Sequence, residues 1–330
     1  MKFIVYGVRK DEEGYAHNWS KENKIDVKLV ADLLNKETVK LAKGYDAIIA
    51  YQQLPYDKEI FTTMKEYGIK DLSIRNVGVD NIPTDAAKAN GVRITNVPSY
   101  SPSAIAELAI TGLMQLLRRT PEFNEKLAKG DFTWEPDIAR ELHTMTVGVV
   151  GTGRIGRAGI NIYKGFGAKV IGYDVFRNPE LEAEGMYVDT LDELYAQADV
   201  ITLHVPAVKE NHHMINKDSI AKMKDGVIII NTARGELIES KDLLAGYKSG
   251  KIGGAVLDVY ENEVGIFNSD FTGKKVPDAT LVELMKQRDI LVTPHVAFYT
   301  ETAVRNMVDV ALDSAKSMIE KGESRNEVKF

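Results

Sequence analysis

The chain has 330 residues, of which 44% are hydrophobic and 27% charged, with 26 glycines and 10 prolines. This is too long for one hydrophobic core and too ordinary in composition for disorder or low complexity, so two folded domains are predicted. The net charge is −6 with both signs interspersed, which argues against nucleic acid as a partner, and the lack of cysteine excludes disulfides, thiolate metal sites and a cysteine nucleophile.

The sequence contains no segment that predicts membrane insertion. The apolar stretch within residues 1–7 is too short for a signal peptide and runs into the charged residues 9–13. The longest apolar segment, residues 104–117, contains Glu107 and Gln115 and is too short to span a bilayer. A cytoplasmic protein with no membrane partner is therefore expected.

The first hundred residues alternate between apolar runs typical of strands and helical segments. The expected strands are residues 3–6, 25–30, 46–50, 72–77 and 92–96. Near-continuous apolar strands that alternate with helices predict a parallel sheet covered on both faces. A helix is expected over residues 101–118, because Ser101 is a good cap and Pro102 fits the first turn.

A second βα series follows this helix. Its expected strands are residues 147–150, 169–173, 200–204, 227–231, 255–259 and 290–293. An amphipathic helix over residues 300–320 is expected to cross back and close the first domain. We therefore predict an α/β protein with two doubly wound parallel-sheet domains, one Rossmann-type and one flavodoxin-like, and a cleft between them. The expected domains are residues 1–100 with 299–330, and residues 101–298, with hinges near 99–101 and 296–300.

The strand over residues 147–150 leads directly into a glycine motif, Gly151-x-Gly153-x-x-Gly156. Gly151 permits a tight turn, Gly153 allows backbone to approach phosphates, and Gly156 allows close packing of helix on strand. The helix that follows offers unpaired N–H groups and a positive dipole end to an anion. Together these features predict a site for the pyrophosphate of a dinucleotide.

An acidic residue indicates which of the two dinucleotides, NAD or NADP, is bound. The next expected strand ends at Asp174, 18 residues after Gly156, where a carboxylate can accept hydrogen bonds from the adenosine ribose hydroxyls. The same carboxylate would repel a 2′-phosphate, so NAD is favoured over NADP. Arg177 could in principle flank a phosphate.

Three polar residues follow strand-like runs in the second domain, namely Arg234, Glu263 and His295. Open α/β sheets bind their ligands at the carboxyl ends of the strands. Hydride transfer between nicotinamide C4 and a carbinol carbon needs a group that takes and returns the hydroxyl proton, and His295 suits this near neutral pH. Glu263 would raise its pKa and fix its tautomer, while Arg234 would polarise the carbonyl and bind a carboxylate through two hydrogen bonds.

Other features are interpreted as structural. The pair His212-His213 lacks the helical spacing and the carboxylate partners of a zinc site, so it is expected in a solvent-facing loop and no metal is predicted. His204 ends a strand and is interpreted as a structural or cofactor-side group. Trp19 and Trp134 are expected to be packing residues.

The motifs of one enzyme family stand along nearly the whole chain. They lie at residues 75–80, 96–102, 149–156, 204–206, 231–235, 257–263 and 293–295. In these motifs the chain resembles the NAD-dependent D-2-hydroxyacid dehydrogenases, most closely their D-lactate dehydrogenase branch in bacteria. The resemblance implies reversible reduction of pyruvate to D-lactate by a homodimer, with His295 as acid/base, Glu263 as its partner and Arg234 as the substrate clamp.

The resemblance also implies the remaining site residues. The substrate domain, residues 1–100 and 299–330, would bind the substrate carboxylate through the backbone of Val77 and Gly78. The pocket wall around the substrate methyl group would consist of Tyr51, Tyr100 and Tyr299. In the NAD-binding domain, residues 101–298, the cofactor would be lined by Gly151, Thr152, Gly153, Arg154, Ile155, Gly156, Asp174, Val205, Pro206, Thr232, Ala233 and Asp258, the last at the nicotinamide end.

Two alternatives stay open at this point. The enzyme could act on another D-2-hydroxy acid, such as 2-hydroxyisocaproate, 2-hydroxyglutarate or phosphoglycerate, although enzymes for the last usually carry an added regulatory domain. Transcriptional corepressors that resemble this family keep the nucleotide domain but act by docking peptides. Pyruvate-dependent loss of NADH absorbance separates an enzyme from such a binding protein.

Overall fold

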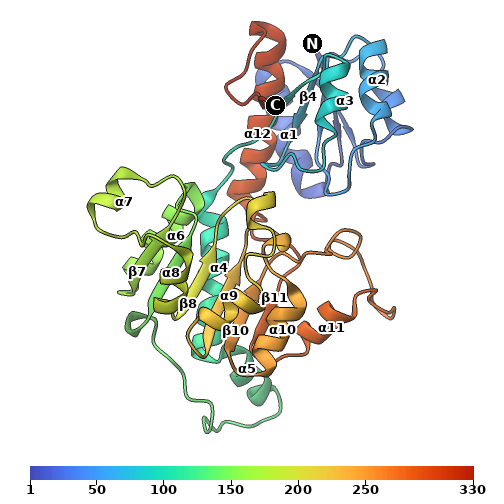
Figure 1. Cartoon of the computed structure of the whole chain (residues 1–330). Helices are drawn as coiled ribbons and strands as arrows, with labels where there is room; N and C mark the ends of the chain where they lie inside the picture. The colour runs from blue at the N-terminus through green and yellow to red at the C-terminus, as the bar shows by residue number, and fades with distance from the viewer. The chain divides into compact units, whose positions relative to one another are not determined.

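The computed structural model describes residues 1–330, which divide into two compact units. The first contains residues 1–101 and 299–330, and the second residues 102–298. Each is built around its own parallel sheet with helices on both faces (Figure 1). Both sheets are fully parallel, so the predicted α/β class with two doubly wound domains is confirmed.

The first unit has a five-stranded sheet in the order β2-β1-β3-β4-β5. Its strands are β1 (Lys2–Tyr6), β2 (Asp26–Val30), β3 (Ala47–Ala50), β4 (Asp71–Ile74) and β5 (Arg93–Thr95). Its helices are α1 (Lys10–Asn23), the 3₁₀ helix η1 (Thr38–Ala42), α2 (Glu59–Glu66), α3 (Thr84–Ala89) and α12 (Glu301–Lys321). The middle strand β3 is apolar throughout because α1 and α12 cover one face of the sheet, while η1, α2 and α3 cover the other.

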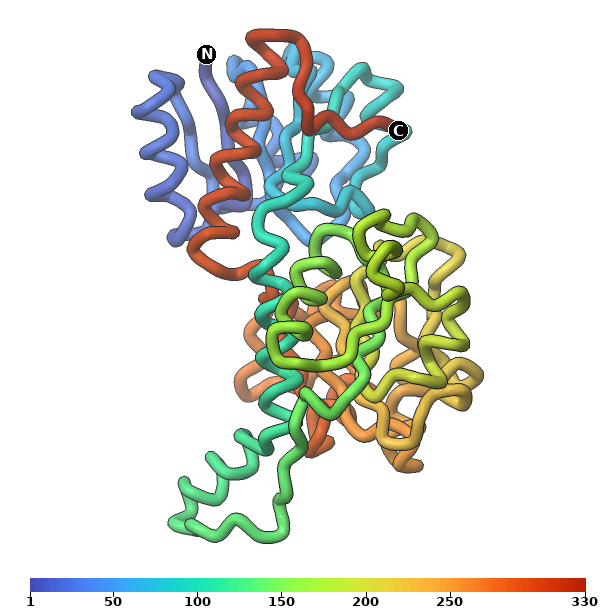
Figure 2. Tube along the Cα trace, turned by 90° about the vertical axis from the view of Figure 1, so that its left-hand side faces the viewer, coloured from blue at the N-terminus to red at the C-terminus, as the bar shows by residue number.

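Helix α12 is part of the first unit although it comes from the end of the chain. It lies beside α1 (Figure 2) and packs on β3 and β4. Thr300 caps its start through a side-chain bond to Ala303 N, and Gly322 ends it with φ of 74°. Trp19 of α1 is buried against this helix and its indole N–H donates to Asp313 at 2.8 Å, so Trp19 is the packing residue that the sequence predicted.

The second unit has a six-stranded sheet in the order β11-β10-β9-β8-β6-β7. Its strands are β6 (Thr146–Val150), β7 (Lys169–Tyr173), β8 (Val200–Leu203), β9 (Val227–Asn231), β10 (Ile252–Leu257) and β11 (Ile290–Val292). Its α-helices are α4 (Pro102–Arg118), α5 (Thr120–Ala128), α6 (Arg154–Gly165), α7 (Pro179–Ala183), α8 (Leu191–Gln197), α9 (Lys217–Lys222), α10 (Ser240–Lys248) and α11 (Ala279–Met285). Short 3₁₀ helices are η2 (Leu142–Thr144), η3 (Lys209–Asn211) and η4 (Gly235–Leu237). Helices α4 and α6 pack on one face, and α8 to α11 on the other.

An arm formed by residues 119–141 extends away from the sheet of the second unit (Figure 2). Arg288 joins the arm to the rest of the unit through its Nε, which lies 3.0 Å from Glu122, and within the arm Lys126 Nζ lies 3.2 Å from Asp137. Trp134 lies on this arm with 76% of its surface exposed, so the expectation that it packs in a core was wrong. The arm passes outside the sheet, where no second layer covers it.

No helix of the structure is both long enough and apolar enough to cross a membrane.

Candidate active site

The glycine motif forms the turn between β6 and α6. Gly151 has φ of 91°, and a Cβ there would come within 2.7 Å of the His204 carbonyl. A Cβ at Gly156 would come within 2.0 Å of the Gly151 carbonyl oxygen, so the helix sits directly on the turn. Nothing lies within 4 Å of a Cβ built at Gly153, the residue that caps α6. The backbone is therefore open at the one glycine expected to face phosphates.

Asp174 is fixed beside this turn. Its Oδ2 accepts hydrogen bonds from Thr152 N at 2.6 Å and Thr152 Oγ1 at 3.1 Å, and its Oδ1 accepts one from Phe176 N at 3.0 Å. A carboxylate oxygen can accept more than one hydrogen bond, so Asp174 retains capacity for a hydroxyl donor. Thr232, after β9, has a buried Oγ1 that makes no hydrogen bond in the protein. These observations fit a dinucleotide at this edge of the sheet.

The other residues expected to line the cofactor follow the same sheet edge. Arg154 and Ile155 begin α6, Val205 and Pro206 follow β8, and Ala233 follows β9. Pro206 and Arg154 are exposed, while Ile155, Val205 and Ala233 are half-buried. The carboxyl ends of β6, β8 and β9 are neighbours in the sheet, so the structure brings these residues to one edge.

His295 and Glu263 form a close pair. The imidazole Nδ1 lies 2.5 Å from Glu263 Oε1, and a carboxylate only accepts, so Nδ1 carries the proton and Nε2 is left for a substrate oxygen. Burial is the largest influence on the pKa of His295 and lowers it, but the hydrogen bond and charge of Glu263 and the charge of Asp258 outweigh it. The net result is that the pKa of His295 is raised, although the charge of Arg234 lowers it. His295 adopts a positive φ of 56° in the loop that follows β11.

Asp258 organises the loop that carries His295. Its side chain is fully buried and accepts from Thr293 Oγ1 at 2.5 Å, Val296 N at 2.9 Å and Ala297 N at 2.9 Å. Its own carbonyl accepts from His295 N at 2.7 Å. Burial raises the pKa of this carboxyl group, although these hydrogen bonds and the charge of His295 act to lower it. The family resemblance implies the nicotinamide end for this residue, and the structure shows that it also holds the loop of His295.

Arg234 lies between β9 and η4. Its Nη1 donates to the Ala233 carbonyl at 2.8 Å, and Asn231 Nδ2 donates to the Arg234 carbonyl at 2.8 Å. The next residue, Gly235, packs so tightly that a Cβ would come within 2.3 Å of the Tyr260 carbonyl oxygen. The loop with Arg234 therefore rests directly on the loop that leads to Glu263. The second unit thus pairs His295 with Glu263 and holds Arg234 near enough for its charge to act on His295.

In the first unit, the turn after β4 presents backbone donors. Asn76 Nδ2 donates to the Gly78 carbonyl at 2.6 Å and Asn96 Nδ2 to the Val77 carbonyl at 2.7 Å. Neither Val77 N nor Gly78 N donates a hydrogen bond within the protein. The turn is thus fixed through its carbonyls while two N–H groups remain available to a carboxylate.

The tyrosines expected in the pocket wall belong to the same unit, and two of them stack on a cation. The Arg9 guanidinium lies 5.5 Å from the ring centre of Tyr51 and 5.4 Å from that of Tyr299. Burial raises the pKa of the Tyr51 hydroxyl to about 12, so it stays protonated at neutral pH. Tyr100 follows in a neighbouring loop, where its carbonyl accepts from Asn306 at 2.6 Å.

Sequence reasoning missed the charged pair beneath Tyr51. Arg75 is 1% exposed and its Nη1 pairs with Glu12 at 3.1 Å, while its Nη2 donates to the carbonyls of Tyr6 and Gly7. A buried guanidinium costs free energy unless it is paired and hydrogen-bonded, and here it is both. The signal in the sequence was an arginine within the run expected as a strand, residues 72–77.

The two adjacent histidines differ in environment. His212 is exposed, as expected, but His213 is half-buried and its Nε2 lies 2.9 Å from Glu261 Oε2. Its Nδ1 lies 3.2 Å from Glu239. The expectation that His213 has no carboxylate partners was therefore wrong, because both partners come from segments distant in the sequence.

His204 lies under the glycine turn. Its Nε2 is 3.0 Å from Thr202 Oγ1, and burial lowers its pKa to about 4. A histidine that stays neutral in this place fits the structural or cofactor-side role expected for it.

Comparison with known proteins identifies the family. Residues 110–297 match the model described as D-isomer specific 2-hydroxyacid dehydrogenase, NAD binding domain. A D-lactate dehydrogenase of Lactiplantibacillus plantarum is 60% identical, with 100% of each chain covered. A solved D-2-hydroxyisocaproate dehydrogenase has a TM-score of 0.92 at 42% identity over 99% of each chain. The NAD complex of a D-isomer specific 2-hydroxyacid dehydrogenase from Lactobacillus delbrueckii ssp. bulgaricus has a TM-score of 0.88 at 36% identity over 100% of each chain.

The chain therefore belongs to the D-isomer specific 2-hydroxyacid dehydrogenases. It is an NAD-dependent oxidoreductase, and the resemblance noted from its sequence motifs is confirmed.

Proposed function

We propose that this enzyme is a D-lactate dehydrogenase that reduces pyruvate reversibly to D-lactate, with His295, Glu263 and Arg234 as its catalytic residues. The observation that carries the proposal is the His295–Glu263 pair, 2.5 Å apart, in the domain that binds NAD. The name of the 60% identical relative supports lactate as the product.

Each of the three catalytic residues has its own role in pyruvate reduction. Bound NADH supplies the hydride to the carbonyl carbon. His295 donates the Nε2 proton to the carbonyl oxygen as that oxygen becomes a hydroxyl, and Glu263 stabilises the protonated ring through Nδ1. Arg234 polarises the same carbonyl and binds the substrate carboxylate, with the N–H groups of Val77 and Gly78 as further donors.

In the cofactor site we assign three kinds of contact. The turn from Gly151 to Gly156 and the start of α6 bind the pyrophosphate. Asp174 accepts from the adenosine ribose hydroxyls, which is the basis for NAD over NADP. Thr232, with its buried Oγ1, lies on the path of the cofactor along the sheet edge.

A panel of 2-keto acids tests this function. The purified enzyme should oxidise NADH with pyruvate at a higher kcat/KM than with 2-ketoisocaproate, 2-ketoglutarate or phosphohydroxypyruvate. Loss of absorbance at the NADH band gives each rate. A branched-acid preference would instead favour the 2-hydroxyisocaproate activity, and no turnover with any keto acid would favour a corepressor-like binding protein.

The Glu263→Gln variant should lose pyruvate reduction at a lower pH than the parent. Reduction requires protonated His295, whose pKa Glu263 raises, so removal of the negative charge lowers that pKa. The alkaline limb of the kcat/KM profile should therefore move down by about one pH unit or more. An alkaline limb that stays in place would contradict the pairing.

We propose that Tyr51 limits the length of the substrate. Tyr51 directly follows β3, and its half-buried ring is stacked beside Arg9. Tyr51→Leu should raise the ratio of kcat/KM for 2-ketoisocaproate to that for pyruvate roughly tenfold or more, because apolar volume becomes available to the longer chain. Steady-state kinetics on both acids gives the ratio. An unchanged ratio would mean that Tyr51 does not face the substrate.

We also propose that the enzyme is a homodimer, and the arm of residues 119–141 supports this. Phe132, Trp134 and Ile138 are exposed by 78, 76 and 88% on an arm held in place by ion pairs. Apolar side chains displayed in this way are typical of a protein interface. The double variant Trp134→Asp, Ile138→Asp should sediment as one chain of 36.6 kDa, while the parent sediments as two.

A matched control is Phe166→Asp, which places the same charge on an exposed apolar residue of the same unit, outside the arm. It should remain a dimer. A parent that sediments as a single chain would contradict the proposal. The cytoplasmic location expected from the sequence stays a prediction.

A further inference from the structure

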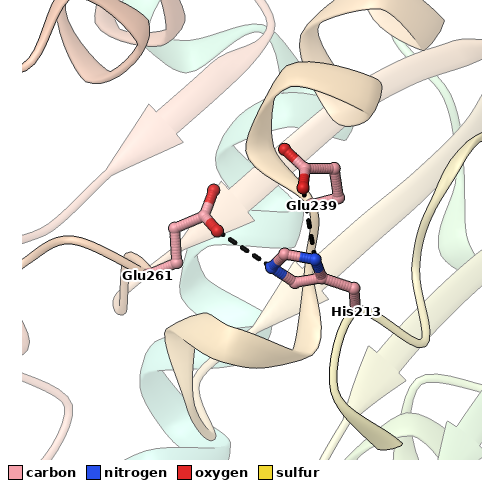
Figure 3. A group of neighbouring side chains, drawn as sticks. All are labelled: His213, Glu239 and Glu261. Atoms are coloured by element: carbon pink, nitrogen blue, oxygen red, sulfur yellow. Dashed lines mark hydrogen bonds and ion pairs between the residues drawn. The ribbon is translucent and has the colours of Figure 1, made fainter.

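His213 lies between two glutamates that come from separate segments (Figure 3). Its Nδ1 is 3.2 Å from Glu239 Oε2 and its Nε2 is 2.9 Å from Glu261 Oε2. The three side chains are only 25, 29 and 17% exposed. Carboxylate oxygens only accept hydrogen bonds, so Nε2–H of His213 donates to Glu261, while Nδ1 faces Glu239.

The same three side chains are of types that bind divalent cations, but their arrangement does not direct them at a single ion. They offer ligand atoms within 4.8 Å of one another. A single ion can bond to only one nitrogen of an imidazole, since the two lone pairs point to different sides of the ring. Here each carboxylate faces a different nitrogen, so the ring links the two glutamates to each other.

One side of this cluster holds the segment that follows Arg234. The His213 N–H donates to the Glu236 carbonyl at 2.8 Å, and Ile215 N donates to the Leu237 carbonyl at 3.0 Å. Glu239 lies at the start of α10, five residues after Arg234. The backbone and the side chain of His213 therefore both fix the course of the chain after Arg234.

The other side holds the segment that carries Glu263. Glu261 uses Oε2 for His213 and Oε1 for Ser240 N, at 3.0 Å. Its neighbour Tyr260 donates its backbone N–H to Glu263 Oε2 at 2.9 Å. Glu261 is thus tied to His213 on one side and is two residues from the partner of His295 on the other.

We propose that His213 is a positioning residue for the hydride-transfer reaction, which fixes the loop of Arg234 relative to the loop of Glu263 by bridging Glu239 and Glu261. The proposal rests on the catalytic roles given above. Gly235 packs against the Tyr260 carbonyl, so the two loops are in direct contact. The His213 bridge then fixes how the two loops are aligned along that contact. Without the ring, Glu239 and Glu261 would lose the side chain that links them.

The test uses His213→Asn, because asparagine tolerates the positive φ of 50° at this position but is too short to reach both glutamates. A shift of about 1 Å in a catalytic group costs up to 10²-fold in rate, so kcat for pyruvate should fall roughly tenfold. The alkaline limb of the pH profile should also move to lower pH, because the contact of Glu263 with His295 is weakened. Thermal unfolding and the Kd for NADH should stay near the parent values.

The matched control is His143→Asn, which removes another histidine paired with a glutamate in the same unit. His143 is 58% exposed, and its Nδ1 lies 3.4 Å from Glu141. This variant should keep the parent kcat and the parent pH profile. If His213→Asn also keeps both, the proposal is wrong.

Two further measurements keep the test decisive. If His213→Asn fails to fold, Glu261→Gln removes one charge of the bridge and should give the same shift of the alkaline limb. Proton NMR gives a readout without substrate, since the short Nδ1–H bond of His295 should produce a low-field resonance that moves or broadens in His213→Asn. A parent that does not reduce keto acids would contradict the proposed function. The NMR signal would still test the role of His213, because a His295 resonance that is unchanged in His213→Asn would contradict that role.

Discussion

The variant His295→Gln is expected to reduce pyruvate with a kcat lower by about 10² to 10⁴, the usual contribution of a positioned general acid. Glutamine keeps a polar group in the loop after β11 but cannot deliver a proton to the carbonyl oxygen. The loop itself should be preserved, because its main anchors are the bonds from Thr293, Val296 and Ala297 to Asp258. Stopped-flow measurement of turnover gives the loss.

The control for His295→Gln is the affinity for NADH, measured by fluorescence titration. It should stay within a few-fold of the parent, since the glycine turn and Asp174 belong to other loops. Survival of turnover would mean that another group donates the proton. His204 is a poor candidate for that donor, because burial lowers its pKa to about 4 and keeps it neutral.

The second large effect is expected for Arg234→Lys. A lysine keeps the positive charge but cannot form two parallel hydrogen bonds to a carboxylate. Loss of a hydrogen bond to a charged group costs about 1.5 to 3 kcal/mol, so kcat/KM for pyruvate should fall between roughly 10- and 150-fold. Most of this should appear in KM, because the clamp binds the substrate before and during the reaction.

Steady-state kinetics with a fixed excess of NADH checks the Arg234→Lys result. The charge at position 234 also lowers the pKa of His295, and lysine preserves this influence, so the pH profile should move little. A normal KM together with a normal kcat would place Arg234 outside the substrate site.

Much of the fold could be predicted from local patterns. Strands buried on both faces are nearly continuous apolar runs, so β9 begins and ends at the residues expected. The edge strand β7, which is only partly buried, also begins and ends as expected. The observed strand ends differ from the expected ones where a side chain at the end of a strand makes other contacts. The run expected to continue to Val259 stops at Leu257, because Asp258 turns inward to hold the His295 loop.

The parts of the site that could not be predicted depend on distant contacts. Glu261 comes 48 residues after His213, so nothing near the histidine pair revealed a carboxylate partner. The pairing of Arg75 with Glu12 likewise joins the end of β4 to α1. Trp134 looked like a core residue by type alone, yet whether an aromatic side chain is covered depends on which layer passes over it.

The central claim is that the enzyme delivers hydride and proton to pyruvate to form one enantiomer of lactate. The most direct test is to incubate the purified enzyme with pyruvate and one equivalent of NADH, and to resolve the product by chiral chromatography. We expect D-lactate in an amount equal to the NADH consumed. Formation of L-lactate, a racemic product, or NADH loss without lactate would contradict the account.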